Sequence, residues 1–244
     1  MNIEVIYSID DFDGISQKTV IVIDVLRAST SIVTAFANGC GSIYPVETIE
    51  AAKILYTNLP DALLCGERDG LRPEFFHLGN SPFEYTPEVV KGKDLILTTT
   101  NGTRALAVAK NAGTILVGSF VNLIAVMDKS LSIGKDIVML PAGRAGGFSW
   151  EDALCAGLMS HELNRRVCNL SMGDGARWSY YAVLGLFGQN PAPSADQLSV
   201  LLGNTVHGMH LKKIGFAKDL QFCADINRFK LAPALSGDKL IMSV

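Results

Sequence analysis

A carboxylate stands within an apolar segment near the N-terminus, where residues 20–27 read Val-Ile-Val-Ile-Asp-Val-Leu-Arg. The run of β-branched residues predicts a strand that is covered on both faces. Asp24 lies near the end of this strand, ahead of Arg27, and Ser29 and Thr30 are good helix-capping residues. A buried strand followed by a capped helix explains the hydroxyls but not the buried acid. We interpret this strand end as one side of a ligand site, because ligands of open α/β sheets bind beyond the carboxyl ends of strands.

A second polar turn, residues 98–103, reads Thr-Thr-Thr-Asn-Gly-Thr between an apolar strand and a helix. Asn101 and Gly102 permit the positive φ that wraps backbone amides around an oxyanion, and Thr100 and Thr103 add hydroxyl donors. The segment lacks the Gly-Lys-Ser/Thr ending of a P-loop. An ordinary turn in which Thr100 or Asn101 caps the helix explains the same residues.

Glu67 and Arg68 follow another predicted strand and begin a segment, 66–86, that is rich in Gly, Pro and charge. A carboxylate beside an arginine at a strand end can hold Mg²⁺ while the guanidinium holds a phosphate. A solvated ion pair is the simpler alternative. We favour a functional role, because a loop this long in a compact domain is usually functional or disordered and the pair Phe75-Phe76 argues against disorder.

Three predicted strands end in a polar turn that contains an arginine and leads to a helix. The arginines are Arg27, Arg104 and Arg144. If the turns converge, they form a pocket lined with guanidinium groups and with the N–H donors of helix N-termini. Such a pocket suits a small, multiply charged anion and favours phosphate or sulfonate binding by the Thr-Asn-Gly turn.

Ser149-Trp150-Glu151-Asp152 matches the capping box that begins a helix, in which Asp152 satisfies the N-cap amide and the helix dipole favours Glu151. Alternatively, one of these acids is a metal ligand or a base that faces the anion pocket, but the two point in different directions on a helix. On the sequence alone we prefer the capping interpretation. The candidate ligands are carboxylates without a thiolate–histidine cluster, so any metal is expected to be Mg²⁺ rather than zinc.

The histidines and the late acidic residues receive simpler interpretations. Asp219 and Asp225 flank Cys223 on a late amphipathic segment, for which a solvated helix face is the default. Four histidines are too scattered for an H-E-x-x-H site and are expected to be surface or satisfied core residues: His77, His161, His207 and His210.

The composition excludes several classes of protein. The chain has 244 residues, 48% hydrophobic and 18% charged, with a net charge of −3, so it can form a sizeable core but has no general basic face for nucleic acid or an anionic membrane. No apolar run is long enough to span a bilayer, and no signal peptide is evident. Five widely spaced cysteines without a C-x-x-C pair favour reduced thiols in a cytoplasmic protein.

Alternation of strands and helices predicts a three-layer α/β/α fold with a largely parallel or mixed central sheet and a mostly helical C-terminal third. We expect a single α/β domain over 1–244, with two closely packed lobes divided near 135–150 as the alternative. Strands are expected at 3–7, 19–26, 42–46, 62–65, 94–98, 114–117 and 136–140, and helices at 29–38, 47–58, 104–111, 119–131 and from 150.

Four segments in order resemble the 2-phosphosulfolactate phosphatase family: 24–30, 66–68, 78–82 and 98–103. The pairs 142–143 and 151–152 and the segment 219–225 also resemble it, so the resemblance covers essentially the whole chain. It implies an α/β/α layered fold and a Mg²⁺-dependent hydrolase that converts 2-phosphosulfolactate to 3-sulfolactate and phosphate, on the route toward coenzyme M.

The resemblance also implies roles for individual residues. Metal binding or water activation would fall to Asp24, Glu67 and Asp152. The sulfonate would serve as a handle whose binding energy positions the phosphate. The anionic ends of the substrate would be clamped by Arg27, Arg68, Arg104 and Arg144, of which the first two act with Asp24 and Glu67 in catalysis, and would be bound by Asn80, Thr100, Asn101, Gly102 and Thr103.

The chain departs from the family pattern in the 66–86 loop, where Phe75-Phe76-His77 replaces an acid and a small residue and Asp69 replaces a glycine. Substrate identity is therefore less constrained than reaction type. A phosphatase of another small phosphorylated acid and a non-catalytic anion-binding protein are the alternatives. Water attack and a phospho-enzyme through Asp24 both stay open, although the D-x-D-x-T signature of haloacid dehalogenases is missing. A homodimer is the expected assembly.

Overall fold

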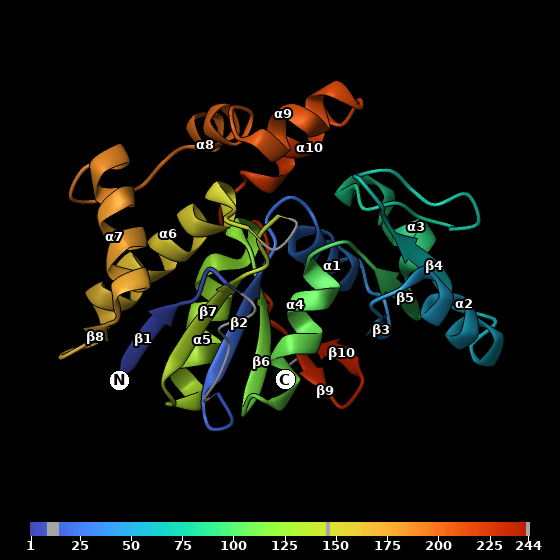
Figure 1. The fold of residues 1–244 in the computed structure, drawn as a ribbon, viewed down its shortest axis with the longest axis horizontal. Coiled ribbons are helices and arrows are strands. Elements are labelled where there is room, and N and C mark those ends of the chain that lie inside the picture. Colours follow the sequence, from blue (N-terminus) through green and yellow to red (C-terminus); the bar gives the residue numbers. More distant parts are fainter. Residues whose placement is uncertain (9–14, 145–146, 243–244) are drawn as a thin grey trace.

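One mixed sheet organises the computed structural model, which describes residues 1–8, 15–144 and 147–242. Its strand order is β4-β5-β3-β10-β9-β6-β2-β7-β1-β8 (Figure 1). The strands are β1 (Asn2–Val5), β2 (Thr19–Ile23), β3 (Ile43–Pro45), β4 (Leu63–Gly66), β5 (Leu95–Thr98), β6 (Thr114–Gly118), β7 (Ile137–Pro141), β8 (Ser171–Met172), β9 (Pro233–Ser236) and β10 (Lys239–Met242).

Helices connect many of these strands along the chain. Among residues 1–8, 15–144 and 147–242, three short 3₁₀ helices lie in the connections: η2 (Pro82–Glu84), η3 (Ala109–Asn111) and η4 (Phe120–Asn122). The α-helices are α1 (Ala28–Ala37), α2 (Ile49–Asn58), α3 (Pro87–Val90), α4 (Gly102–Val108), α5 (Leu123–Ile133), α6 (Trp150–Arg166), α7 (Asp174–Phe187), α8 (Ala195–Leu202), α9 (Val206–Lys213) and α10 (Ala217–Cys223). None of the helices in the described part of the chain combines the length and apolar character that a membrane-spanning segment requires.

Strand β2 is buried on both faces, as its sequence predicts. Val20 and Val22 belong to a core that includes Val33 of α1 and residues of β3, β5 and α4. Ile21 and Ile23 belong to a second core with residues of α5, α6 and α7. Alternate side chains of one strand therefore contribute to two different hydrophobic layers, which confirms the predicted layered α/β fold.

Two parallel groups of strands meet through the C-terminal hairpin. β4, β5 and β3 are parallel neighbours, as are β6, β2, β7, β1 and β8. The hairpin β9–β10 lies between the groups and pairs antiparallel with β6 on one side and with β3 on the other. The hairpin is absent from the sequence prediction, although Gly237-Asp238 between two apolar runs is a hairpin-turn signal, and Gly237 has φ of 62°.

The three antiparallel steps make the two groups run in opposite senses along the sheet. In a flat sheet, their carboxyl ends would lie at opposite edges. Neighbouring strands are rotated by about 20–25°, and five steps separate β5 from β2, so rotation of roughly 100° accumulates between them. This rotation accounts for the meeting of the ends of β2 and β5 at one cavity.

The start of α1 differs from the sequence prediction. The helix begins at Ala28, its N-cap residue is Arg27, and no side chain caps it. Ser29 and Thr30 form the first turn instead: the Ser29 hydroxyl accepts a hydrogen bond from the Asp24 N–H, and the Thr30 hydroxyl donates to the Val25 carbonyl. Both hydroxyls therefore bind the strand end.

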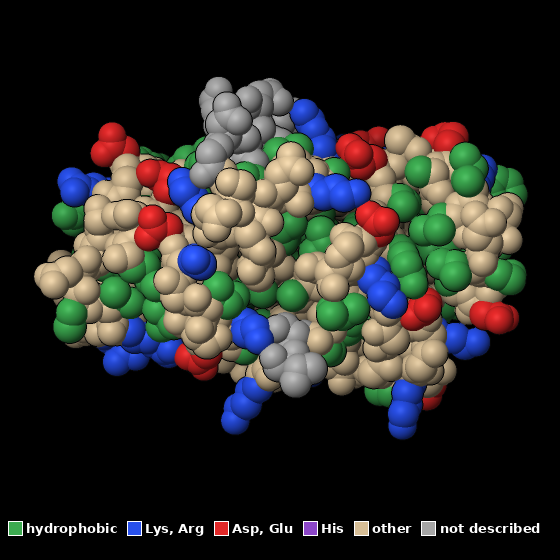
Figure 2. Space-filling view, turned by 90° about the horizontal axis from the view of Figure 1, so that it is seen from below, with side chains coloured by type: hydrophobic (Ala, Val, Ile, Leu, Met, Phe, Trp, Pro, Cys, Tyr) green, Lys and Arg blue, Asp and Glu red, His purple; other side chains and the backbone are tan. Residues whose placement is uncertain are grey.

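The C-terminal helices cover one end of the sheet. In Figure 1, α8, α9 and α10 lie above the end of β2, and α10 packs against α8, α9 and η2. The opposite face, seen from below in Figure 2, has basic and acidic side chains interspersed among apolar ones. The strand ends that the sequence singled out therefore lie under a helical cover.

Because the hairpin joins the two parallel groups, its buried side chains should matter more than its exposed ones. Leu240 is fully buried opposite Ile43 and Leu235, whereas Met242 on the same strand is 38% exposed. We expect Leu240→Ala to reduce the free energy of unfolding by about 2–5 kcal/mol and the matched Met242→Ala by less than about 1 kcal/mol. Urea unfolding measures both; equal losses would contradict the role assigned to the hairpin.

Candidate active site

A cavity of about 390 Å³ lies beneath the C-terminal helices, where the turns after β2, β4, β5 and β7 meet. Its volume suits a small ligand. It is lined by Asp24, Leu26, Arg27, Glu67, Asp69, Gly70, Asn80, Thr100, Asn101, Arg144, His207 and His210. Seven of the side chains that the sequence singled out therefore meet in one place: Asp24, Arg27, Glu67, Asn80, Thr100, Asn101 and Arg144.

Asp24 is held at the cavity by the turn that follows β2. Its Oδ1 accepts a hydrogen bond from the Ala28 N–H at 3.2 Å, and its own N–H donates to the Ser29 hydroxyl at 2.9 Å. The pKa of Asp24 is raised to about 6, chiefly by burial; the charge of His207 and the hydrogen bond from the Ala28 N–H oppose the rise, whereas the charges of Glu67 and Glu151 contribute to it. Asp24 is therefore a buried acid that titrates close to neutral pH.

Glu67 connects two of the loops. Its Oε1 accepts a hydrogen bond from the Thr100 N–H at 2.8 Å, and its Oε2 accepts from the Gly70 N–H at 2.7 Å and from the Thr100 hydroxyl at 3.3 Å. The carboxylate therefore fixes the loop after β4 against the Thr-Asn-Gly turn after β5. The turn does not present all of its backbone donors to the cavity, because the Thr100 N–H is used by Glu67.

Arg27 lines the cavity but is already paired. Its Nη1 is 2.7 Å from Asp219 Oδ2, its Nη2 donates to the Gly70 carbonyl at 2.7 Å, and its guanidinium lies 4.3 Å from the centre of the Phe216 ring. Asp219 also accepts from the Ser81 hydroxyl. The prediction of a solvated helix face at Asp219 is wrong, because this side chain is buried as the partner of Arg27.

Asp152 lies beside the cavity without lining it. Its N–H donates to the Ser149 hydroxyl, so Ser149 caps α6 as predicted, but its carboxylate accepts from the Val25 N–H at 2.8 Å. Burial, followed by the negative charges of Asp24 and Glu151, raises the pKa of Asp152 well above its ordinary value. This side chain fastens the turn after β2 to the start of α6.

The remaining arginines have different positions. Arg68 points its guanidinium at the Glu67 and Glu47 carbonyls and at the Thr98 hydroxyl, and it does not line the cavity. Arg104 is exposed on α4 and also lies outside the lining. Arg144 is exposed and lines the cavity. The structure therefore brings Arg27 and Arg144, but neither Arg68 nor Arg104, to the predicted anion pocket.

The Thr-Asn-Gly turn is partly structural. Thr99 and Thr103 exchange hydrogen bonds, because each hydroxyl accepts from the other residue's N–H at 3.1 Å. A Cβ at Gly102 would lie 2.6 Å from Ala28 Cβ and 2.9 Å from Asp24 Oδ2. Gly102 therefore permits α4 to approach the turn that holds Asp24, whereas Thr100 and Asn101 line the cavity.

Asn80 supplies a polar group that lacks a partner. Its Oδ1 is buried and finds no hydrogen-bond partner among the described residues, although its side chain lines the cavity. Its backbone carbonyl accepts from the Ser31 hydroxyl at 2.7 Å, which fixes the loop against α1. An unpaired buried acceptor at a cavity is favourable only when a ligand or water supplies the missing donor.

Two histidines of α9 were missed by the sequence prediction. His207 Nδ1 lies 3.3 Å from Glu151 Oε1, and His210 Nε2 lies 3.0 Å from the Asp69 carbonyl oxygen. Both line the cavity. Their i, i+3 spacing places them on one helix face, and this spacing is the sequence signal that could have found them.

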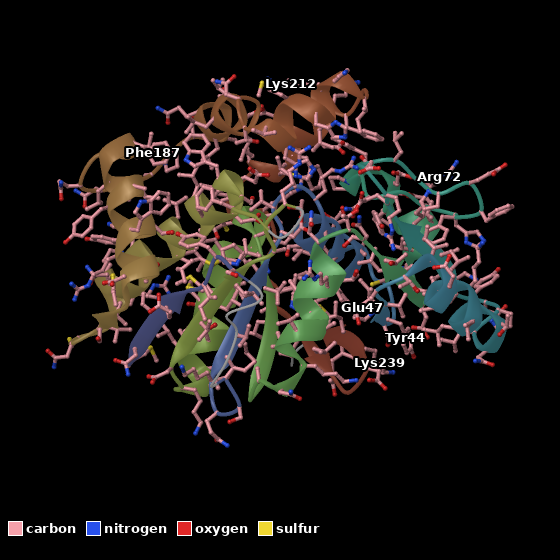
Figure 3. All side chains as sticks on the ribbon, in the orientation of Figure 1. Tyr44, Glu47, Arg72, Phe187, Lys212 and Lys239 are labelled. Carbon is pink, nitrogen blue, oxygen red and sulfur yellow. The ribbon has the colours of Figure 1, made fainter. Side chains whose placement is uncertain are left out.

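Two further cations lie at the same edge without entering the cavity. Figure 3 shows Arg72 on the loop before β5 and Lys212 on α9, both at the upper side of the molecule. Arg72 donates to the His77 carbonyl at 2.9 Å, and Lys212 donates to the Gly203 carbonyl at 2.7 Å. These cations fasten loops and do not line the cavity.

The cavity has carboxylates suited to a hard cation. Within the described ranges, no group of three or more His, Cys, Asp or Glu side chains is arranged to hold a metal ion. Mg²⁺ usually needs only one or two protein carboxylates, because waters and substrate phosphates supply its other ligands. Asp24 and Glu67, which both line the cavity, therefore fit the donor chemistry of Mg²⁺ without forming a closed metal site.

Comparison with known proteins points to one family. The sequence profile described as 2-phosphosulpholactate phosphatase matches residues 8–238. A probable 2-phosphosulfolactate phosphatase of Clostridium acetobutylicum is 36% identical over 244 residues, which cover 99% of this chain and 100% of the relative. Proteins with the same description from Carboxydothermus hydrogenoformans and Thermotoga maritima are each 38% identical, over 96% and 92% of this chain and 92% of each relative. The chain therefore belongs to the 2-phosphosulfolactate phosphatase family.

Proposed function

We propose that this phosphatase hydrolyses 2-phosphosulfolactate to 3-sulfolactate and phosphate with the help of Mg²⁺. The observation that carries the proposal is the cavity itself, where Asp24, Glu67, Asn80 and Arg144 meet from separate loops. These side chains combine carboxylates for a hard cation with polar groups for a small anion. The relatives' descriptions support the choice of substrate.

The charges in the cavity favour a bound cation. Asp24, Glu67 and Asp69 line it, and Arg27 is neutralised by Asp219. A phosphate ester that also bears a carboxylate and a sulfonate would meet strong repulsion there. When bound, Mg²⁺ neutralises phosphate charge and orients the reacting groups. We propose that Asp24 and Glu67 hold it, and that the buried Asp152 acts by fastening the loop behind them.

The substrate's charged ends have separate candidate partners. Asn101 and Asn80 line the cavity with amide groups suited to hydrogen-bond phosphate oxygens, whereas Thr100, which also lines it, donates its N–H and hydroxyl to Glu67. Arg144 is the exposed guanidinium of the lining and suits the sulfonate, which keeps its charge throughout the reaction. Binding of this remote group positions the phosphate, so it should increase the rate of the chemical step as well as the affinity.

Most of the departures from the family pattern lie away from the cavity. Phe75 is exposed, Phe76 is buried in the small core around α2, and His77 Nδ1 accepts from the Leu64 N–H. Asp69 is the departure that does line the cavity. This distribution supports a family-like substrate.

Turnover of a panel of small phosphate esters tests the proposal. The purified protein with Mg²⁺ should release phosphate from 2-phosphosulfolactate with a higher kcat/KM than from 2-phospholactate, phosphoglycolate or 2-phosphoglycerate. Chelation should abolish the reaction, and added Mg²⁺ should restore it. A preference for another phosphorylated acid would overturn the proposed identity of the substrate. Binding without phosphate release would overturn the proposed enzymatic function.

We also propose that the protein is cytoplasmic and forms a homodimer. The five cysteines are free thiols, which supports a reducing, cytoplasmic compartment. Trp178 and Tyr181 of α7 are exposed, and a second copy of the chain would cover them in the proposed homodimer.

Asp24→Asn should separate activity from stability. The amide keeps the acceptor for the Ala28 N–H but removes the charge, so we expect turnover to fall at least about 10²-fold. The pKa of Asp24 is raised from 3.8 to about 6 in the folded state, so proton uptake stabilises the fold below pH 4 and this stabilisation is lost as the pH rises through 6. At pH 8 without metal, the free energy of unfolding of Asp24→Asn should therefore be about 1–3 kcal/mol higher than that of the wild type. Rates near the wild type would contradict the assignment.

The pKa of Asp24 also predicts how kcat/KM depends on pH. Because the pKa of Asp24 is about 6, its carboxylate loses its charge on acidification, and kcat/KM should fall below about pH 6. Higher Mg²⁺ concentrations should move this acid limb to lower pH, because the cation binds the deprotonated carboxylate. Rate profiles at two Mg²⁺ concentrations measure the effect; a limb independent of Mg²⁺ would argue against cation binding at Asp24.

A further inference from the structure

His207 and Glu151 form a carboxylate–imidazole pair at the cavity. His207 Nδ1 lies 3.3 Å from Glu151 Oε1, and the two side chains are 19% and 4% exposed. His207 comes from α9 in the C-terminal cover, whereas Glu151 lies in the first turn of α6. Because His207 also lines the cavity, its ring connects this carboxylate to the ligand space.

Glu151 is suited to hold the ring in one orientation. Burial alone would raise the pKa of Glu151, but His207, whose Nδ1 lies 3.3 Å from the carboxylate, lowers it below its usual value. Its position at a helix N-terminus also favours the charged form. A carboxylate that accepts from Nδ1–H fixes the tautomer and leaves Nε2 as the ring nitrogen available to the cavity.

Hydrolysis of the phosphate ester calls for a general acid, which the His207–Glu151 pair can supply. Cleavage of the phosphate ester leaves an alkoxide of high basicity, and a positioned acid accelerates such a departure. Arg27 cannot supply a proton, because its guanidinium stays protonated and is held by Asp219. His210 is the other imidazole of the lining, but its Nε2 is occupied by the Asp69 carbonyl oxygen.

We propose that His207, held by Glu151, is the catalytic residue that protonates the leaving-group oxygen. This inference rests on the proposed phosphatase function. The bond from phosphorus to the ester oxygen breaks, and its electron pair goes to that oxygen, which takes the proton of His207 Nε2. A water oxygen forms the new bond to phosphorus and gives dihydrogen phosphate, which returns one proton to the imidazole and leaves as hydrogen phosphate. Glu151 is a positioning residue, since it acts through the ring.

Substitution of the ring tests the proton transfer. His207→Asn keeps a donor near Glu151 but cannot act as an acid, so kcat should fall about 10²–10³-fold with KM changed less than about threefold. His161→Asn is the matched control, because His161 stacks on Tyr180 outside the cavity lining. Circular dichroism and sulfolactate binding verify that both variants fold. A folded His207→Asn with kcat within threefold of the wild type, or a loss confined to KM, would overturn the proposal.

The positioning role has its own measurement, which needs no turnover. Long-range ¹H–¹⁵N spectra of histidine-labelled protein should show neutral His207 protonated at Nδ1 in the wild type and shifted toward the Nε2–H form in Glu151→Gln. Wild-type His207 protonated at Nε2 would overturn the pairing. If the wild type hydrolyses none of the phosphate esters, the proposed function fails; if it does and His207→Asn is equally fast, only the present inference fails.

Discussion

The buried ion pair between Arg27 and Asp219 connects the turn after β2 to α10, close to the two ends of the sequence. Separating either charge from the other would leave it unpaired in a low dielectric, at a cost of about 3–5 kcal/mol. The other bonds of the pair reach the Gly70 carbonyl and the Ser81 hydroxyl, so one interaction orders three segments around the cavity. The C-terminal helices therefore cover the strand ends in a defined position, and the histidines of α9 reach the cavity. Arg27, which the sequence analysis assigns to substrate binding, therefore also holds the segments around the cavity together.

The cavity holds more negative charge than a site for polyanions should tolerate. Asp24, Glu67 and Asp69 line it, and the buried Asp152 and Glu151 lie behind them. The raised pKa values of Asp24 and Asp152 follow from burial and from this crowding. Repulsion between buried carboxylates of this kind is typical of functional sites, where the fold loses some stability to keep reactive groups in place. A divalent cation reduces this repulsion, since the cation attracts both the carboxylates and the phosphate.

Much of the fold follows from the sequence because its signals are local. Alternation of apolar strands and helices locates the layers, and the apolar run of β2 predicts burial on both faces. The hairpin β9–β10 was missed because its strands are short and its pairing with β3 and β6 is set by tertiary contacts. The same limit applies to the site. Asp24, Glu67, Thr100 and Asn101 follow strand ends and could be predicted, whereas Asn80 was expected from the family resemblance; the structure brings all five to one cavity.

Residues that reach the cavity from remote helices were not predictable in this way. His207, His210 and Asp219 approach it because α9 and α10 fold back over the sheet, which no local pattern specifies. The directions of Arg68 and Asp152 depend on which backbone groups need partners, so spacing alone does not give them. The catalytic and metal-binding roles of Arg68 and Asp152 stay predictions.

The place of the C-terminal hairpin has a consequence for synthesis of the chain. The strands that bear Asp24 and Glu67 leave the ribosome early, but the hairpin that joins their two groups is completed by residues 239–242. Contacts between such distant segments form slowly, because the intervening chain loses much entropy when it closes. A nascent chain that still lacks the hairpin therefore contains two incomplete half-sheets with exposed edges, and the cavity forms only after the hairpin has been synthesised. Chaperone binding during synthesis would protect those edges.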